Sequence, residues 1–347
     1  MRRILRLSLV TTWLMTNAAR SQPDWIASLP EYKPQQTASG TIRIWGHGAY
    51  GHDFIETLVL KWEDGFRKYQ PGVNFDNKLY GTASAMGALY AGTGDLALLG
   101  REIWPGEITA FREVFHYPPT GVEILTGSYD VRNKDFALVI YAHKDNPISQ
   151  LTLAQVDAIF GSEHRRGTKN IRTWGDLGMG GQWAARPINV YGFGISRGFS
   201  YFFEQAVFQG SSKWNPDMAE FSDEKQPDGK LVDAGKRVLN ALANDPYGVA
   251  YSSALYANPQ VKPLSLAAEE GAPAVAASRD TVQDRSYPLN RVIPMFFNRR
   301  PGMAVDPKVR EFVRYILSRQ GQQPVLEDKG YLPLTAKVAE SERLKLD

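Results

Sequence analysis

The sequence predicts an α/β protein with mostly parallel sheets, and two observations favour that fold class. The first is a repeated order of apolar strand, glycine-rich turn and amphipathic helix, which is typical of the units that build parallel sheets. The second is composition, because the 347 residues are 43% hydrophobic and 22% charged, close to the averages of soluble globular proteins. A disordered chain, a collagen-like fibre and a protein with several membrane spans are therefore excluded.

The first strand–turn–helix unit begins at residue 41. Residues 41–45 alternate polar and apolar side chains, as a half-buried strand does, and lead into the glycine-rich segment 46–51. Apolar side chains then recur every four positions from residue 54 onward, which predicts an amphipathic helix. The same order recurs, with further strands predicted at 73–80, 94–100, 136–141, 188–191 and 249–251 and further helices at 85–91, 153–160, 199–208 and 307–319.

The N-terminal residues have the pattern of a secretory signal. Three Arg residues within the first six are followed by a mostly apolar run over 7–15, which is too short to span a bilayer. Small residues at Ala19 and Ser21 predict cleavage before Gln22, and a buried N-terminal helix is the alternative interpretation. Residues 1–21 contain four Arg and no acidic residue, so cleavage takes the formal net charge from +3 to −1.

The composition of the mature chain limits its partners and its chemistry. Cysteine is absent, which excludes a disulfide scaffold, a Cys-ligated metal site, a thiol nucleophile and a lipid anchor on Cys. Once the basic signal is removed, no Lys/Arg stripe is left to indicate nucleic-acid binding. An exported chain without Cys or a second long apolar segment is expected in the periplasm of a bacterium with two membranes.

Three glycine-rich turns between a strand and a helix are the candidate functional sites, and they cover residues 46–51, 81–84 and 192–198. At the start of a helix, unpaired backbone N–H groups and the positive end of the helix dipole favour an anion. Three such helix starts that converge on one cleft would form an anion site. Any α/β fold has several turns of this kind, so spacing alone leaves their convergence open.

Two arginines lie beside these turns. Arg101 follows the strand predicted to end at residue 100, and Arg197 lies within the third turn. Either guanidinium group could hold an oxyanion with two parallel hydrogen bonds. The alternative for each is a surface ion pair with a nearby acid, such as Glu102 for Arg101.

Three polar residues at and after the first turn, His47, His52 and Asp53, could be interpreted as metal ligands. Their spacing is not that of a zinc site, so capping or surface roles are favoured and no metal or cofactor is expected. No G-x-S-x-G elbow, phosphate-binding P-loop or HExxH motif is expected in this chain. No nucleophile is predicted beside a base, and an enzyme is not expected.

Six short motifs are spread along the chain. They are Gly-Thr-Ala-Ser at 81–84, Gly-Thr-Gly-Asp-Leu at 92–96, Trp-Gly-Asp-Leu-Gly at 174–178, Asp-Pro-Tyr-Gly-Val-Ala-Tyr at 245–251, Tyr-Pro-Leu-Asn-Arg at 287–291 and Gly-Tyr-Leu-Pro-Leu at 330–334. In sequence and order these motifs resemble the phosphate-binding subunit of bacterial ABC-type phosphate transporters, in the type II periplasmic binding protein superfamily. The resemblance extends from about residue 40 to residue 334.

The resemblance implies two α/β lobes, each a mostly parallel sheet flanked by helices, with the ligand in the cleft between them. The first lobe would be discontinuous, at 40–132 plus 255–347, and the second would cover 133–254. A periplasmic, monomeric, non-catalytic protein is implied, which delivers phosphate or a related oxyanion to an ABC-type permease in the inner membrane.

The resemblance also places the ligand residues in the three turns, at Tyr50, Gly51, Thr82, Arg101, Ser196, Arg197 and Gly198. The chain departs from the family at several of these positions. Tyr50 stands where the family has Thr, Phe193 stands where it has Arg, and Phe199 stands where it has Thr. The Asp that accepts a hydrogen bond from protonated phosphate has no counterpart at 100–101.

These departures leave alternative functions open. The aromatic rings at positions 50, 193 and 199 could form the floor of a pocket for a different small solute. They could instead fill a cleft that binds nothing, in a periplasmic sensory or scaffold protein that keeps the fold. A hydrolase of phosphate esters is the third alternative, and it depends only on His47, His52 and Asp53.

Overall fold

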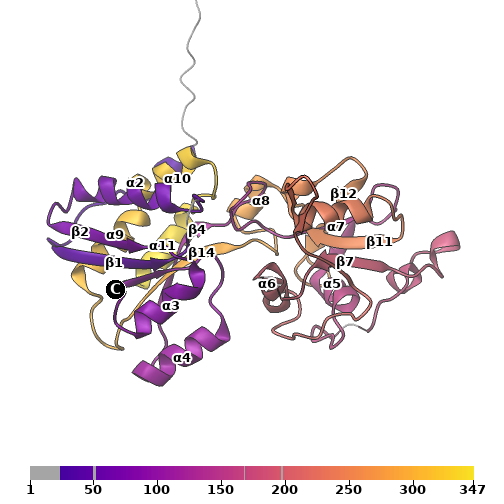
Figure 1. Ribbon diagram of the computed structural model, residues 1–347, viewed down its shortest axis with the longest axis horizontal. Helices are drawn as coiled ribbons and strands as arrows, with labels where there is room; N and C mark the ends of the chain where they lie inside the picture. Colours follow the sequence, from indigo (N-terminus) through magenta and orange to yellow (C-terminus); the bar gives the residue numbers. More distant parts are fainter. Residues whose placement is uncertain (1–23, 50–51, 168, 197) are drawn as a thin grey trace, which may run out of the picture.

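The computed structural model describes residues 24–49, 52–167, 169–196 and 198–347. Two α/β lobes lie side by side, each with a five-stranded sheet at its centre (Figure 1). The predicted secretory signal lies outside the described residues. Within these ranges, no helix is both long and apolar enough to cross a membrane. The predicted α/β class and its two-lobed arrangement are confirmed.

The first lobe contains the sheet of strand order β2-β1-β3-β14-β4. Its strands are β1 (Gly40–Gly46), β2 (Val73–Lys78), β3 (Leu96–Leu98), β4 (Thr120–Thr126) and β14 (Val292–Phe297). The helices of this lobe are α1 (Asp24–Ala27), α2 (Glu56–Arg67), α3 (Thr82–Tyr90), α4 (Pro105–Phe115), α9 (Pro307–Ile316), α10 (Arg319–Asp328) and α11 (Ala336–Leu344). Its core includes Ile26, Leu29 and Tyr32, so the lobe begins before residue 40, where the sequence analysis started it.

The second lobe contains the sheet of strand order β12-β5-β11-β7-β8. Its strands are β5 (Val139–His143), β7 (Asn189–Phe193), β8 (Ala219–Phe221), β11 (Gly248–Ser252) and β12 (Val261–Pro263). Its helices are α5 (Leu153–Phe160), α6 (Gly198–Ala206), α7 (Ala234–Leu242) and α8 (Arg279–Gln283), with short 3-10 turns at Trp174–Leu177, Gly181–Trp183 and Ala254–Tyr256. Two small ribbons pair β6 (Gln150–Thr152) with β13 (Ser265–Ala267) and β9 (Glu224–Lys225) with β10 (Leu231–Val232).

Four of the five strands in each large sheet run in one direction and one strand runs the opposite way, so the prediction of mostly parallel sheets is confirmed. β1 pairs in parallel with β2 and β3, whereas β14 pairs antiparallel with β3 and β4. In the second sheet, β7 pairs in parallel with β8 and β11, whereas β5 pairs antiparallel with β11 and β12. β5 and β14 each follow a passage of the chain from one lobe to the other, and they enter the sheet in the opposite direction.

The chain returns to the first lobe later than predicted. Residues after 254 were assigned to the first lobe, but β12 is bonded to β5 in the second sheet. Leu264, Leu266 and Tyr287 are buried in the core of the second lobe. The return to the first lobe therefore falls between Tyr287 and the start of β14, because the intervening chain buries its apolar side chains against the second sheet.

Candidate functional site

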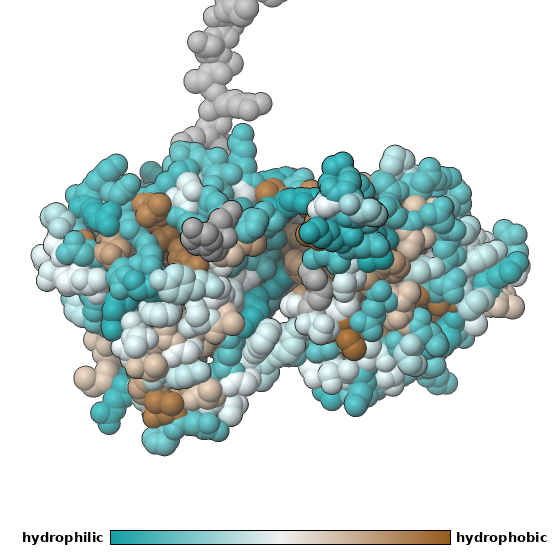
Figure 2. All heavy atoms as spheres, viewed as in Figure 1, coloured by the Kyte–Doolittle hydropathy of each residue, from teal (hydrophilic) through white to brown (hydrophobic). Residues whose placement is uncertain are grey.

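A cavity of about 620 Å³ opens between the two lobes, and Figure 2 shows the recess between them. The first lobe lines it with residues near the ends of β1 and β3 and at the start of α3. The second lobe lines it with residues at the starts of α6 and α7. The segment 132–136, which passes from the first lobe to the second, and Arg291, which lies on the return, complete the lining.

Three helix N-termini face this cavity. α3 begins at Thr82, α6 begins at Gly198 and α7 begins at Ala234, and each of these residues lines the cavity. The positive ends of the helix dipoles and the first-turn N–H groups favour a negatively charged ligand there. Two of these starts follow predicted turns. The sequence analysis missed α7, although Asp233 immediately before an apolar periodic segment is an N-cap pattern.

The structure brings together three of the seven predicted ligand residues. Thr82, Arg101 and Gly198 line the cavity. Ser196 is exposed and is not part of the lining. Tyr50, Gly51 and Arg197 lie outside the described residues.

The Thr82 hydroxyl is fixed at the start of α3. Its Oγ1 accepts a hydrogen bond from the backbone N–H of Gly100 at 3.1 Å and lies 3.5 Å from Nδ1 of His47. A side chain at position 100 could not be accommodated, because an added Cβ would lie 2.1 Å from Nδ1 of His47. The close approach of β1 and the end of β3 therefore sets the position of this hydroxyl.

His47 is a wall of the cavity rather than a source of charge. Its ring is buried, with Nε2 at 2.7 Å from the hydroxyl of Tyr331 and 3.7 Å from Oδ2 of Asp135. Burial lowers the pKa of His47 below its ordinary value, despite the nearby Asp135 carboxylate. The imidazole is therefore neutral near pH 7.

The other two residues of the metal hypothesis are not arranged around an ion. His52 is exposed at the rim of the cavity. Asp53 accepts a hydrogen bond at 3.1 Å from the backbone N–H of Thr57, in the first turn of α2, which is a capping role. Across the described ranges, no group of three or more His, Asp or Glu residues could hold a metal ion.

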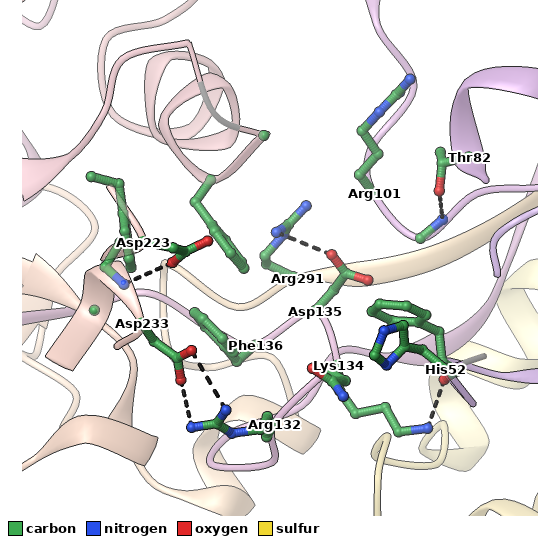
Figure 3. Close-up of a pocket in the computed structure, with 18 of the residues that line it drawn as sticks. His52, Thr82, Arg101, Arg132, Lys134, Asp135, Phe136, Asp223, Asp233 and Arg291 are labelled. Carbon is green, nitrogen blue, oxygen red and sulfur yellow. Dashed lines mark hydrogen bonds and ion pairs between the residues drawn. The ribbon is translucent and has the colours of Figure 1, made fainter. Parts of the chain in front are cut away.

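Arg101 is already paired. Its guanidinium donates two hydrogen bonds to the carboxylate of Glu107, at 2.8 and 2.9 Å, and lies 3.7 Å from the centre of the Trp104 ring. Figure 3 shows this side chain directed away from Arg291 and Asp135. The geometry favours the ion-pair alternative for Arg101, with Glu107 as its partner instead of Glu102.

A buried arginine that the sequence analysis missed lies at the base of the cavity. The side chain of Arg291 is only 1% exposed and donates to the carboxylate of Glu102 at 2.8 Å, with a second carboxylate, that of Asp135, at 3.5 Å. Burial opposes its charge, but these carboxylates outweigh it and raise the pKa of Arg291 above its ordinary value. The rings of Phe199 and Phe202, from the second lobe, cover its guanidinium group.

Aromatic rings form the second-lobe side of the cavity. Phe199 stacks on Phe136 with ring centres 4.4 Å apart and an interplanar angle of 11°, and on Phe193 at 5.3 Å. Phe136 and Phe193 are buried. The two positions where the family has Thr and Arg are therefore packed into one stack beside the start of α6.

A model of the PBP superfamily domain matches residues 33–320 of the chain. The chain belongs to the PBP superfamily. The phosphate-binding protein PstS of Pseudomonas aeruginosa is 34% identical over 315 residues, which are 90% of this chain and 89% of that protein. The protein SphX of Synechococcus elongatus is 23% identical over 277 residues, 78% of this chain and 72% of SphX. The resemblance found in the sequence blocks is confirmed.

A solved structure of PstS from Borrelia burgdorferi matches this PBP-superfamily chain with a TM-score of 0.56 at 16% identity, over 86% of this chain and 100% of that one. An ABC-type phosphate transport receptor from Vibrio cholerae gives 0.51 at 18% identity, over 84% of this chain and 99% of that one. At these identities the two structures support the PBP fold alone.

The passage between the lobes is tied to both sides in this member of the PBP superfamily. Arg132 forms an ion pair at 2.6 Å with Asp233, the residue before α7. Two residues along, Lys134 donates a hydrogen bond at 2.6 Å to the backbone carbonyl of Phe54, ahead of α2. Figure 3 shows these two side chains pointing in opposite directions from the same segment.

The expectation that the chain has no G-x-S-x-G elbow is wrong, because the third turn contains that pattern. Residues 194–198 read Gly-Ile-Ser-Arg-Gly, which fits the G-x-S-x-G pattern of serine hydrolases and lies between a strand and a helix, as that pattern requires. A hydrolase also needs a His base within hydrogen-bond reach of the serine. No hydrogen bond joins Ser196 to a His in the described part of the chain, and the two His residues of the cavity lining are His47 and His52.

Proposed function

We propose that this chain is an exported, non-catalytic solute-binding protein that holds phosphate or a related oxyanion between its two lobes. One observation carries the proposal: the N-termini of α3 and α6, one from each lobe, line the same cavity. An anion between them receives N–H donors and favourable helix dipoles from both lobes at once. A ligand bound by both lobes favours the closed arrangement, because only that arrangement makes both sets of contacts.

The relatives named as phosphate-binding proteins support phosphate as the ligand. We assign the Thr82 hydroxyl and the N–H groups at Gly198 as donors, and keep Tyr50, Gly51, Ser196 and Arg197 as further ligand residues. Arg101 contributes as part of the wall, since Glu107 neutralises its charge.

The wider role follows from the same family membership. The closed chain presents both lobes to an ABC-type permease in the inner membrane and releases the anion there. The mature protein, from residue 22 onward, acts in the periplasm as a monomer and needs no cofactor.

A second candidate function is a sensory or scaffold protein with a cleft that no longer binds an anion. Two observations favour this function. Phe136, Phe193 and Phe199 stack together, and the last two stand at positions where the family has a charged or hydroxyl side chain. Arg101 is paired with Glu107, so its charge is not free for a ligand.

A thermal-shift panel separates the two functions. The melting temperature of the mature chain is measured alone and with phosphate, sulfate, molybdate or an organic phosphate. At about 100 times its dissociation constant, a ligand of the folded state adds about 2.7 kcal/mol, which raises the melting temperature by a few degrees. We expect phosphate to give this shift at micromolar concentration. No shift with any of these anions would contradict the transport role and favour the scaffold.

A further inference from the structure

A second hollow, of about 440 Å³, lies on the first lobe and shares no lining residue with the cavity between the lobes. Helix α9 contributes Arg314 and helix α11 contributes Arg343 to it. We refer to it as the α9–α11 hollow. It is lined by Ser28, Pro30, Arg314, Ala336, Glu340, Arg343, Leu344 and Asp347.

The two arginines of this hollow carry buried donors without acceptors. Arg314 is only 6% exposed. Its Nε atom and the Nη1 atom of Arg343 are buried and have no hydrogen-bond partner in the described part of the chain. A buried donor of a charged group that lacks an acceptor is costly, and native proteins rarely keep one unless a ligand, ion or water satisfies it.

Most of the neighbouring carboxylates are already engaged. Glu311, on the same helix as Arg314, accepts hydrogen bonds from the Tyr32 hydroxyl at 2.7 Å and from a backbone N–H at 3.3 Å. Asp347 holds Arg310 at 2.6 Å. Glu340 is the remaining acid of the lining, and it is exposed at the rim.

The positive charges of the two arginines also act on each other. Burial and the charge of Arg314 lower the pKa of Arg343, while Asp347 and Glu311 oppose that shift. Asp347 and Glu311 offset part of the repulsion between the two guanidinium groups, and an anion between these groups would offset more of it.

We propose that the α9–α11 hollow binds a small oxyanion of the phosphate or sulfate type between Arg314 and Arg343. The planar guanidinium group offers paired donors that match two oxygens of such an anion. Because Arg314 lies on α9 and Arg343 on α11, we expect each to contact a different part of the bound ion. The site is separate from the cavity between the lobes and does not depend on the proposed function.

The test counts anion sites on the mature chain by equilibrium dialysis with radiolabelled sulfate, and separately phosphate, at low ionic strength. The variant is Arg314→Met/Arg343→Met, and the matched control is Arg67→Met/Arg112→Met, which removes two arginines on α2 and α4. We expect the first variant to bind one anion fewer per chain than the wild type and the control. Equal numbers in all three proteins would overturn the proposal. An intact cavity site would remain in every variant, so the two sites are told apart.

If the double variant does not fold, a single variant provides a second test. Arg343→Gln, at a half-buried position, is titrated with sulfate in the same buffer. We expect its affinity for the anion of the hollow to be at least about tenfold weaker than that of the wild type, since a lost charged hydrogen bond weakens binding by that order. An unchanged affinity would contradict the assignment.

Discussion

Single side chains set the charge of the cavity between the lobes. Arg101 pairs with Glu107, and Arg291 pairs with Glu102 and Asp135. Among the described residues, the groups left to attract an anion in the proposed site are therefore mainly the backbone donors at helix starts. A site of this kind selects its ligand by hydrogen-bond geometry, because unpaired oxygens of a buried anion are costly.

The buried imidazole of His47 gives a pH dependence with a defined sign. Burial holds the pKa of His47 below its ordinary value of 6.5 in the folded chain. The unfolded chain then binds more protons, so the stability due to neutral His47 is present above about pH 6.5 and is lost as the pH falls below it. We expect denaturant unfolding between about pH 8 and pH 5 to show a smaller loss of stability for His47→Gln than for the wild type.

The control for this prediction is His52→Gln, at an exposed position on the rim of the same cavity. This variant should lose stability in acid as the wild type does. If His47→Gln declines as steeply as the wild type, then His47 is not held neutral by burial.

The sequence predicted some residues of the site and missed others for one physical reason. Thr82 and Gly198 follow local turns, and the order of strand, turn and helix is visible in a short window. Arg291 was missed because its role depends on Glu102 and Asp135, which are far away in the chain and meet it only after folding. Arg101 and Glu107 are only six residues apart in the sequence. Their ion pair was missed because it depends on the helix Pro105–Phe115, which places Glu107 beside Arg101.

At the scale of helices and strands, features set by nearby residues were also predicted, and features set by distant residues were not. The predicted helix at 153–160 has the observed bounds of α5, whose start is fixed by a capping box between Thr152 and Gln155. The apolar run at 136–141 overlaps the buried strand β5. The direction of β5 and β14 could not be predicted, because apolar periodicity reports burial and carries no information on the direction of the partner strand.

The passages between the lobes give a prediction at the scale of elements. Arg291 lies just before β14 and joins the return passage to Glu102 and to Asp135 of the outward passage. Replacing it with Met leaves two carboxylates facing a buried site without a cation. We expect Arg291→Met to lower the free energy of unfolding by about 3–5 kcal/mol, measured by denaturant unfolding at neutral pH.

The matched control is Arg279→Met, which removes an arginine that pairs with Asp130 at 2.9 Å in an exposed position. An exposed pair contributes about 1 kcal/mol or less. Losses of equal size in the two variants would show that the buried network does not stabilise the passages as we infer.

At the scale of the whole molecule, the proposed anion site needs both lobes. The start of α3 belongs to the first lobe and the start of α6 belongs to the second, and both line one cavity (Figure 3). The passage 132–136 forms the base of that cavity and is bonded to both sides. The base of the cavity is therefore joined to both lobes by side-chain contacts.

The measurement that tests the central claim most directly is a calorimetric titration of the mature chain with phosphate, alongside Thr82→Val and Thr82→Ser. Val removes the hydroxyl at the start of α3 with little change in shape, and Ser keeps it. A lost hydrogen bond to a charged ligand costs about 1.5–3 kcal/mol, so we expect phosphate to bind Thr82→Val at least about tenfold more weakly. Thr82→Ser should stay close to the wild type. Equal phosphate affinity in all three proteins, or no phosphate binding by the wild type, would contradict the account.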